Sequence, residues 1–266
     1  MLLIADNYQL TREPLSGAIA VYDADTLKEA ARRLVSDGAE AIDLNFGPLA
    51  RDAEGKAAFC LQAVRSVTDI PLLLDTVNPR VVRTALAHGT GGRLIINGFS
   101  LEPFKRDHIL PLAVEFGVEI VGYLLDARSQ VPAGLEERLS TAIELYRIAR
   151  EAGLPAERLI IDPVIVPLNW QDALQRNHDL LEIIRCLPEM LGHPVKTVAA
   201  LSNLTSGAPP NARRAKVQSA YLPMLIEAGL SMLMLDWNQT AAVAAACISR
   251  RLMGRGVFSW VEFHRP

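Results

Sequence analysis

The chain has 266 residues, with 27 Lys and Arg against 30 Asp and Glu, and so carries a formal net charge of −3. A charge this close to balance disfavours a nucleic-acid or anionic-membrane surface, because both need a concentrated positive field. No uncharged apolar run reaches the ~18 residues of a membrane span, and the opening MLLIADNYQL lacks the basic leader of a signal peptide, so we expect a cytoplasmic protein.

Eight short apolar runs alternate with stretches of helical periodicity along the chain. In order, the runs cover residues 2–6, 41–45, 71–75, 93–97, 119–125, 158–162, 197–203 and 232–236. Most are uninterrupted hydrophobic stretches of strand length, which is typical of strands covered on both faces. They therefore predict a parallel sheet.

The stretches between the runs carry helix start and stop signals. Thr26 and Glu29 have the spacing of a capping box, and Gly38 stands where a left-handed residue closes a helix. Asn78 and Pro79 have the pattern of an N-cap followed by proline at the first helical position. These signals predict helices between successive strands.

Eight strand–helix units of about 30 residues each fit a closed (β/α)₈ barrel, and we expect residues 1–266 to form one domain. An open, doubly wound parallel sheet is the alternative, and it would leave edge strands that need cover. No GxGxxG motif follows the first run, and eight units are many for an open sheet. The α/β barrel of TIM type is favoured.

Acidic and amide residues stand at the end of almost every predicted strand. The set is Asp6, Asn7, Asp43, Asn45, Asp75, Asn97, Asp126, Asp162, Ser202, Asn203 and Asp236. Each alone could be a turn former or a helix cap. In a barrel, however, the carboxyl ends of all the strands meet at one mouth, where active sites are built.

Other residue types are missing from these strand ends. The histidines (His88, His108, His178, His193 and His264) fall in helices, helix ends or the tail, and Cys60, Cys186 and Cys247 are far apart. We therefore expect buried thiols, no bound metal and no Ser–His or Cys–His pair. With no Lys or Arg at a strand end, the predicted mouth suits a ligand with an amidine-like N–H edge, which a buried carboxylate can bind through two hydrogen bonds.

Five ordered motifs resemble the pterin-binding barrel family. They are AIDLNFGP (41–48), LLLDTVNP (72–79), LIING (94–98), LIIDPVIVP (159–167) and AALSNLTSG (199–207). The family includes dihydropteroate synthase, the folate domain of methionine synthase, and the methyltetrahydrofolate:corrinoid/iron–sulfur protein methyltransferases. The resemblance is closest to the last group and implies a dihydropteroate synthase-like barrel.

Carried over residue by residue, the resemblance implies a set of ligand contacts. Asp75, Asn97 and Asp162 match positions that hydrogen-bond the pterin ring, and Asn203 matches the asparagine that reaches N5, with Ser202 beside it. Asp43 and Asn45 match a motif that lines the same mouth. Two segments depart from the family: Asp6 and Asn7 replace a Glu-Arg pair, and loop 204–214 is different. Arg213 or Arg214 could meet a glutamate tail, and a solvated charge at the start of a helix explains either residue equally well.

The resemblance implies transfer of the N5-methyl group of 5-methyltetrahydrofolate to the Co(I) of a corrinoid carried by a partner protein, with Asn203 as the catalytic residue. A dihydropteroate synthase-type enzyme is an alternative, but it would be expected to carry Lys and Arg at the last strand ends to stabilise an anionic leaving group. A non-catalytic folate-binding protein is a second alternative, which the departure at Asp6 and Asn7 keeps open.

The last predicted helix bears on association. Residues 241–247 read AAVAAAC and are apolar around most of the helix, whereas an outer barrel helix is normally polar on one side. Close packing against the barrel explains this almost as well as a subunit contact does. A homodimer that buries the helix agrees with the family.

Overall fold

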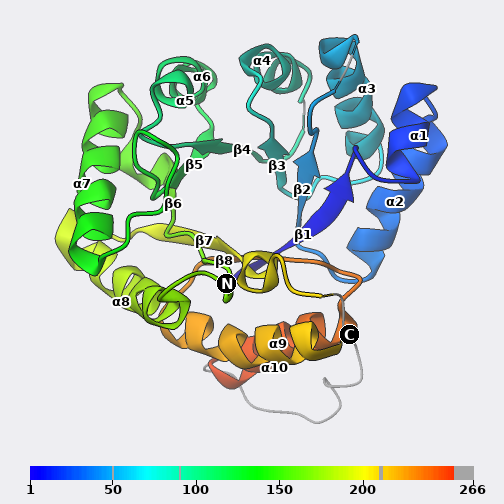
Figure 1. The fold of residues 1–266 in the computed structure, drawn as a ribbon. Helices are drawn as coiled ribbons and strands as arrows, with labels where there is room; N and C mark the ends of the chain where they lie inside the picture. The colour runs from blue at the N-terminus through cyan, green and yellow to red at the C-terminus, as the bar shows by residue number, and fades with distance from the viewer. Residues whose placement is uncertain (50, 90, 210–211, 255–266) are drawn as a thin grey trace.

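The computed structural model describes residues 1–49, 51–89, 91–209 and 212–254. Eight parallel strands form a closed barrel in the order β1-β2-β3-β4-β5-β6-β7-β8, and β8 pairs with β1. Helices surround the strands, with α1–α3 on one side, α7 on the other, and α9 and α10 together below (Figure 1). The predicted barrel is confirmed, and the open-sheet alternative is wrong because the pairing of β8 with β1 closes the sheet.

The strands are β1 (Leu2–Gln9), β2 (Ala41–Asn45), β3 (Leu72–Asp75), β4 (Leu94–Phe99), β5 (Glu119–Tyr123), β6 (Leu159–Asp162), β7 (Lys196–Ala200) and β8 (Met232–Leu235). The helices are α1 (Leu15–Ala20), α2 (Ala24–Ser36), α3 (Ala53–Arg65), α4 (Pro79–His88), α5 (Pro103–His108), α6 (Leu110–Phe116), α7 (Leu135–Glu151), α8 (Ala173–Leu191), α9 (Ala212–Glu227) and α10 (Thr240–Leu252). Two short 3₁₀ helices are η1 (Ala156–Arg158) and η2 (Leu201–Thr205).

The predicted helix signals are correct with one exception. Asn78 caps α4 by accepting from the Arg80 N–H, and Gly38 has φ +94° after α2. The capping box at Thr26 is wrong, because α2 already begins at Ala24, two residues before Thr26. Its N-cap is Asp23, whose carboxylate accepts from the backbone of Thr26 at 3.3 Å and from its hydroxyl at 2.6 Å.

The core has two layers on the two faces of the barrel wall. The larger layer lies between strands and helices, and the smaller fills the barrel interior. The interior side chains are Ile4, Ala41, Leu73, Ile95, Val121, Ile160, Val198, Met232 and Met234. Because side chains alternate between the faces of a strand, these residues define which positions of each strand point into the barrel.

No helix among the described residues combines the length and apolar character needed to cross a bilayer.

Candidate functional site

Strand alternation turns the polar strand ends inward. Asp43, Asp75 and Asn97 each follow an interior hydrophobic residue by two positions, and Asp162 does so on β6. The register also aligns them: Asn45 pairs with Asp75, and Asp75 pairs with Asn97, across β2, β3 and β4. The same pleat that buries the interior hydrophobics therefore gathers acids and amides at the carboxyl end of the barrel.

Four predicted site residues line one cavity of about 300 Å³: Asp75, Asn97, Asp162 and Asn203. They come from β3, β4, β6 and η2, which lie far apart in the sequence. The three other predicted site residues, Asp43, Asn45 and Ser202, lie outside this lining. Asp43 and Asn45 instead contact residues that do line it.

One chain of hydrogen bonds fixes the amide of Asn97. Its Oδ1 accepts from the Tyr123 hydroxyl at 2.5 Å, and its Nδ2 donates to Asp43 Oδ1 at 3.0 Å. Burial raises the pKa of Tyr123 well above its ordinary value, so the phenol stays protonated and can only donate here. Asn97 keeps one amide N–H and one lone pair for a ligand.

Asp75 is held in a similar way from the neighbouring strand. Asn45 Nδ2 donates to Asp75 Oδ2 at 2.5 Å, while Asn45 Oδ1 accepts from the Gly47 N–H at 3.0 Å. One Asp75 oxygen therefore has a fixed donor. The other is available to a ligand.

Burial dominates the acid–base behaviour of the cavity. It raises the pKa of Asp162 to about 7, against the opposing effects of the Val164 N–H and Arg138. It also raises the pKa of Asp75 to about 6, while Lys105 and Asn45 act in the opposite direction. Burial and the nearby Asp75 raise the pKa of Asp43 well above its usual value. A ligand with N–H donors would stabilise the ionised carboxylates and return the pKa values of the lining acids toward normal.

Asn203 reaches the cavity from a different kind of element. The apolar run predicts Ser202 and Asn203 in the seventh strand, but β7 ends at Ala200. Both residues belong instead to the 3₁₀ helix η2. The Asn203 side chain is partly exposed and lines the cavity, so its amide can meet a ligand.

Ser202 lies beside Asp6, to which its hydroxyl is hydrogen-bonded. Burial and the nearby Asp236 raise the pKa of Asp6 to about 6, whereas the Ser202 hydroxyl and Arg12 lower it. Ser202 and Asp6 therefore form a second polar contact at the barrel end.

Two lining residues with polar side chains, Tyr123 and Lys105, were not among the predicted ones. Tyr123 is the inward end of β5, a position that counting by two from Val121 would have found. Lys105 comes from α5, beyond any strand end, and its ammonium lies 3.2 Å from Glu102. The lining thus contains a cation as well as acids and amides.

Two of the polar strand ends have local structural roles. β5 ends at Tyr123, and the Asp126 carboxylate accepts from the backbone of Arg128 and Gln130 in its own turn. Asp236 accepts from the Asn238 N–H at 2.9 Å. Turn formation explains both of these residues.

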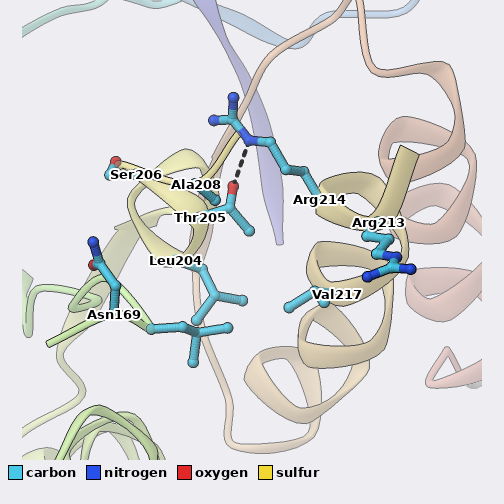
Figure 2. A pocket seen from close by; sticks show the side chains of 9 residues that line it. Asn169, Leu204, Thr205, Ser206, Ala208, Arg213, Arg214 and Val217 are labelled. Carbon is cyan, nitrogen blue, oxygen red and sulfur yellow. Dashed lines mark hydrogen bonds between the residues drawn. The ribbon is translucent and has the colours of Figure 1, made fainter. Parts of the chain in front are cut away.

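A second, smaller pocket of about 170 Å³ lies next to Asn203 along η2. Figure 2 shows its side chains: Leu204 and Val217 form an apolar wall, and Arg213 and Arg214 project from the start of α9. Arg214 Nε donates to Thr205 Oγ1 at 3.3 Å. The pocket combines apolar surface with positive charge.

None of the described histidines lines the cavity that contains Asp75 and Asn203, and His264 lies outside the described residues. Across residues 1–49, 51–89, 91–209 and 212–254, no group of three or more His, Cys, Asp or Glu side chains is arranged to hold a metal ion.

The cavity can bind a flat, polar heterocycle. Asp75 and Asp162 each present a carboxylate to N–H donors, and Asn97 can both donate and accept. Asn203 stands apart from these three and can donate to an atom at the edge of the ring.

Comparisons with known proteins identify the family of this chain. A family model described as "Pterin binding enzyme" matches residues 10–236. Methionine synthase of Mycobacterium tuberculosis is 26% identical over 222 residues, which are 80% of this chain but only 18% of that enzyme. Dihydropteroate synthase of Synechocystis is 24% identical, over 66% of this chain and 61% of that enzyme.

Solved structures share the fold. Dihydropteroate synthase of Thermus thermophilus superposes with a TM-score of 0.69 at 21% identity, covering 94% of each chain. The Stenotrophomonas maltophilia enzyme gives a TM-score of 0.71 at 18% identity, covering 96% of this chain and 94% of that one.

Proposed function

This chain belongs to the pterin binding enzyme family, and we propose that within it the chain transfers the N5-methyl group of 5-methyltetrahydrofolate to the Co(I) of a corrinoid carried by a partner protein. The observation that carries the proposal is the meeting of Asp75, Asn97, Asp162 and Asn203 in one cavity. The fold is shared by enzymes of several activities, so the choice among them depends on this site.

The three strand-borne residues would hold the pterin. Asp75 and Asp162 would accept from the N–H donors of the ring, and Asn97 would add a donor and an acceptor whose direction Tyr123 and Asp43 fix. A rigid ring leaves its N5 substituent at the open end of the barrel.

Asn203 would act on the leaving group. When the bond between N5 and the methyl carbon breaks, its electron pair stays on N5, which then takes a proton from water. An amide N–H directed at N5 binds that developing lone pair more strongly than it binds the substrate amine. It therefore lowers the activation free energy of methyl transfer. The acceptor protein supplies the Co(I) nucleophile to which the methyl group becomes bonded.

The remainder of the folate would lie toward the second pocket. Leu204 and Val217 offer apolar surface to an aromatic ring, and Arg214 offers positive charge to a carboxylate (Figure 2). A folate with its glutamate tail matches both properties better than a bare pterin does.

We also propose that the protein is a homodimer. α10 buries Ala242, Val243 and Ala246 against the barrel, yet leaves Ile248 and Leu252 exposed. These exposed apolar side chains suit a subunit contact. Light scattering on the purified protein measures the mass directly.

A dihydropteroate synthase-type activity is the second candidate, because the fold matches solved enzymes of that name. Such an enzyme releases diphosphate and needs free positive charge at the mouth. Lys105 lines the cavity, but its ammonium is already close to Glu102. The methyl transfer needs no such cation, which favours the first proposal.

A single-turnover assay with cob(I)alamin and 5-methyltetrahydrofolate tests the proposal. We expect methylation of the cobalt by the wild-type protein and a slower chemical step in Asn203→Ala, by about 2–4 kcal/mol of barrier if the amide acts like an oxyanion-hole donor. Asp126→Ala is the control, because Asp126 serves only its own turn.

Three other results would count against the proposal in different ways. An unchanged rate in Asn203→Ala removes that residue from the mechanism. Binding of the folate with no methyl transfer favours a non-catalytic binding protein. Condensation of a dihydropterin diphosphate with p-aminobenzoate favours the second candidate.

A further inference from the structure

The polypeptide that follows β6 has an unusual backbone next to a cavity acid. Val164 has φ +61°, in the left-handed region that β-branched residues rarely adopt. In this conformation its N–H donates to Asp162 Oδ1 at 2.7 Å. The strained residue therefore fixes the direction of the Asp162 carboxylate, and such strain persists only where surrounding contacts enforce it.

The enforcing contact comes from α7, outside the barrel wall. Arg138 is 0% exposed, and its Nη2 donates to the carbonyls of Pro163 and, at 3.2 Å, Val164. Its Nη1 donates to the Arg176 carbonyl of α8 at 2.7 Å. One guanidinium on α7 thus binds the carbonyls of both residues that follow Asp162 and, at the same time, a carbonyl of α8.

Burying an arginine is unfavourable unless its charge and N–H groups are used. Burial and the nearby Arg176 lower the pKa of Arg138 to about 10, so it remains a cation at neutral pH. Its positive charge in turn favours the ionised form of Asp162. No strand-end pattern in the sequence accounts for this residue.

We propose that Arg138 is a positioning residue for ligand binding: it holds the Pro163–Val164 turn so that the Asp162 carboxylate is directed into the cavity. The side chain does not line the cavity and acts through Asp162. The consequence for pterin affinity rests on the proposed function, whereas the consequence for Asp162 itself does not.

The first experiment follows the ionisation of Asp162 without any ligand. Carbon-13 NMR titration of its carboxyl group is compared in wild type, Arg138→Met and Arg65→Met. Arg65 is the matched control, since its guanidinium also donates to backbone carbonyls, those of Ile70 and Arg93, at the opposite end of the barrel.

We expect the pKa of Asp162 to rise in Arg138→Met, because a nearby opposite charge is lost, and to stay unchanged in Arg65→Met. The ionisable groups that face Asp162 and Arg138 are otherwise the same in all three proteins: Asp43, Asp75, Lys105, Tyr123, Arg176, Asp179 and Tyr221. An identical titration of Asp162 in wild type and Arg138→Met overturns the proposal.

The second experiment measures binding of 5-methyltetrahydrofolate by calorimetry across pH 6 to 9. We expect Arg138→Met to lose on the order of tenfold to a hundredfold in affinity, as when the partner that orients a binding group is removed. The loss should grow smaller as the pH rises and Asp162 ionises. Arg65→Met should bind like wild type even if its melting temperature falls.

Arg138→Lys covers the case in which Arg138→Met does not fold. A single ammonium keeps the charge but cannot span three carbonyls, so we expect a smaller loss of affinity in the same direction. Wild-type affinity in Arg138→Lys overturns the positioning role. If wild type itself binds no pterin, the proposed function fails and the titration of Asp162 alone decides on Arg138.

Discussion

Replacing Asp162 by asparagine should stabilise the ligand-free protein at alkaline pH. The carboxylate is 4% exposed, and burial raises its pKa from 3.8 to about 7. A carboxyl group with a raised pKa binds more protons in the folded than in the unfolded chain, so the free energy of unfolding falls as the pH rises through that window. Asparagine has the same shape, still accepts from Val164, and does not titrate.

The size of the effect follows from the shift. Each pKa unit is worth 1.36 kcal/mol, so the ionised Asp162 lowers the stability of the folded state by on the order of 4 kcal/mol above pH 7, as an upper limit. About 3 kcal/mol of this develops between pH 5 and pH 8. The pKa of about 7 already includes the attraction of Arg138 for the carboxylate, and any effect of the substitution that does not depend on pH cancels when the two pH values are compared.

Urea unfolding of wild type and Asp162→Asn at pH 5 and pH 8 measures this change. The variant's advantage over wild type should be larger at pH 8. Asp126→Asn is the control with the opposite sign, because backbone N–H groups lower the pKa of that exposed carboxylate and its loss should slightly destabilise the protein. Equal differences between Asp162→Asn and wild type at both pH values would refute the reasoning.

Two further predictions concern the cavity. Asp75→Ala should weaken 5-methyltetrahydrofolate binding by about 1.5–3 kcal/mol, because ring N–H donors lose a charged acceptor. Asp126→Ala should bind normally. Calorimetry measures both affinities, and equal affinities of Asp75→Ala and wild type would contradict a pterin contact at Asp75. Tyr123→Phe should weaken the same binding by about 1 kcal/mol, because the Asn97 amide loses the donor that orients it. Unaltered affinity in Tyr123→Phe would mean that Asn97 needs no such support.

Strand positions could be predicted from the sequence because an interior barrel strand is hydrophobic on both faces. The run LLLD ends at Asp75 in both the pattern and the structure. The inward direction of Asp75 and Asn97 followed from their strand-end positions and the closed barrel. Ser202 and Asn203 were assigned to the seventh strand, but η2 begins after Ala200, and an apolar run does not distinguish a strand from the turn of helix that continues it.

The residues that the sequence did not predict are those that act across elements. Lys105 reaches the cavity from α5, and its place depends on how that short helix packs over the barrel end. In the sequence, Arg138 is indistinguishable from the other charged residues of α7. Only the tertiary structure brings its guanidinium within hydrogen-bond distance of the carbonyls that follow β6. Such contacts leave no periodic signal in the chain.

Asn45, Asp75 and Asn97 align in one row across three strands. Because of this alignment, the site should tolerate insertions and deletions in some parts of the chain and not in others. Removing one residue from the middle of β3 would turn Asp75 toward the helices and Leu74 into the barrel, and so would abolish the row in one step. Insertions in the turns at the opposite end of the barrel would leave the row untouched. Among natural or engineered variants of this chain, gaps should therefore collect at the amino-terminal end of the barrel and be absent from the strands.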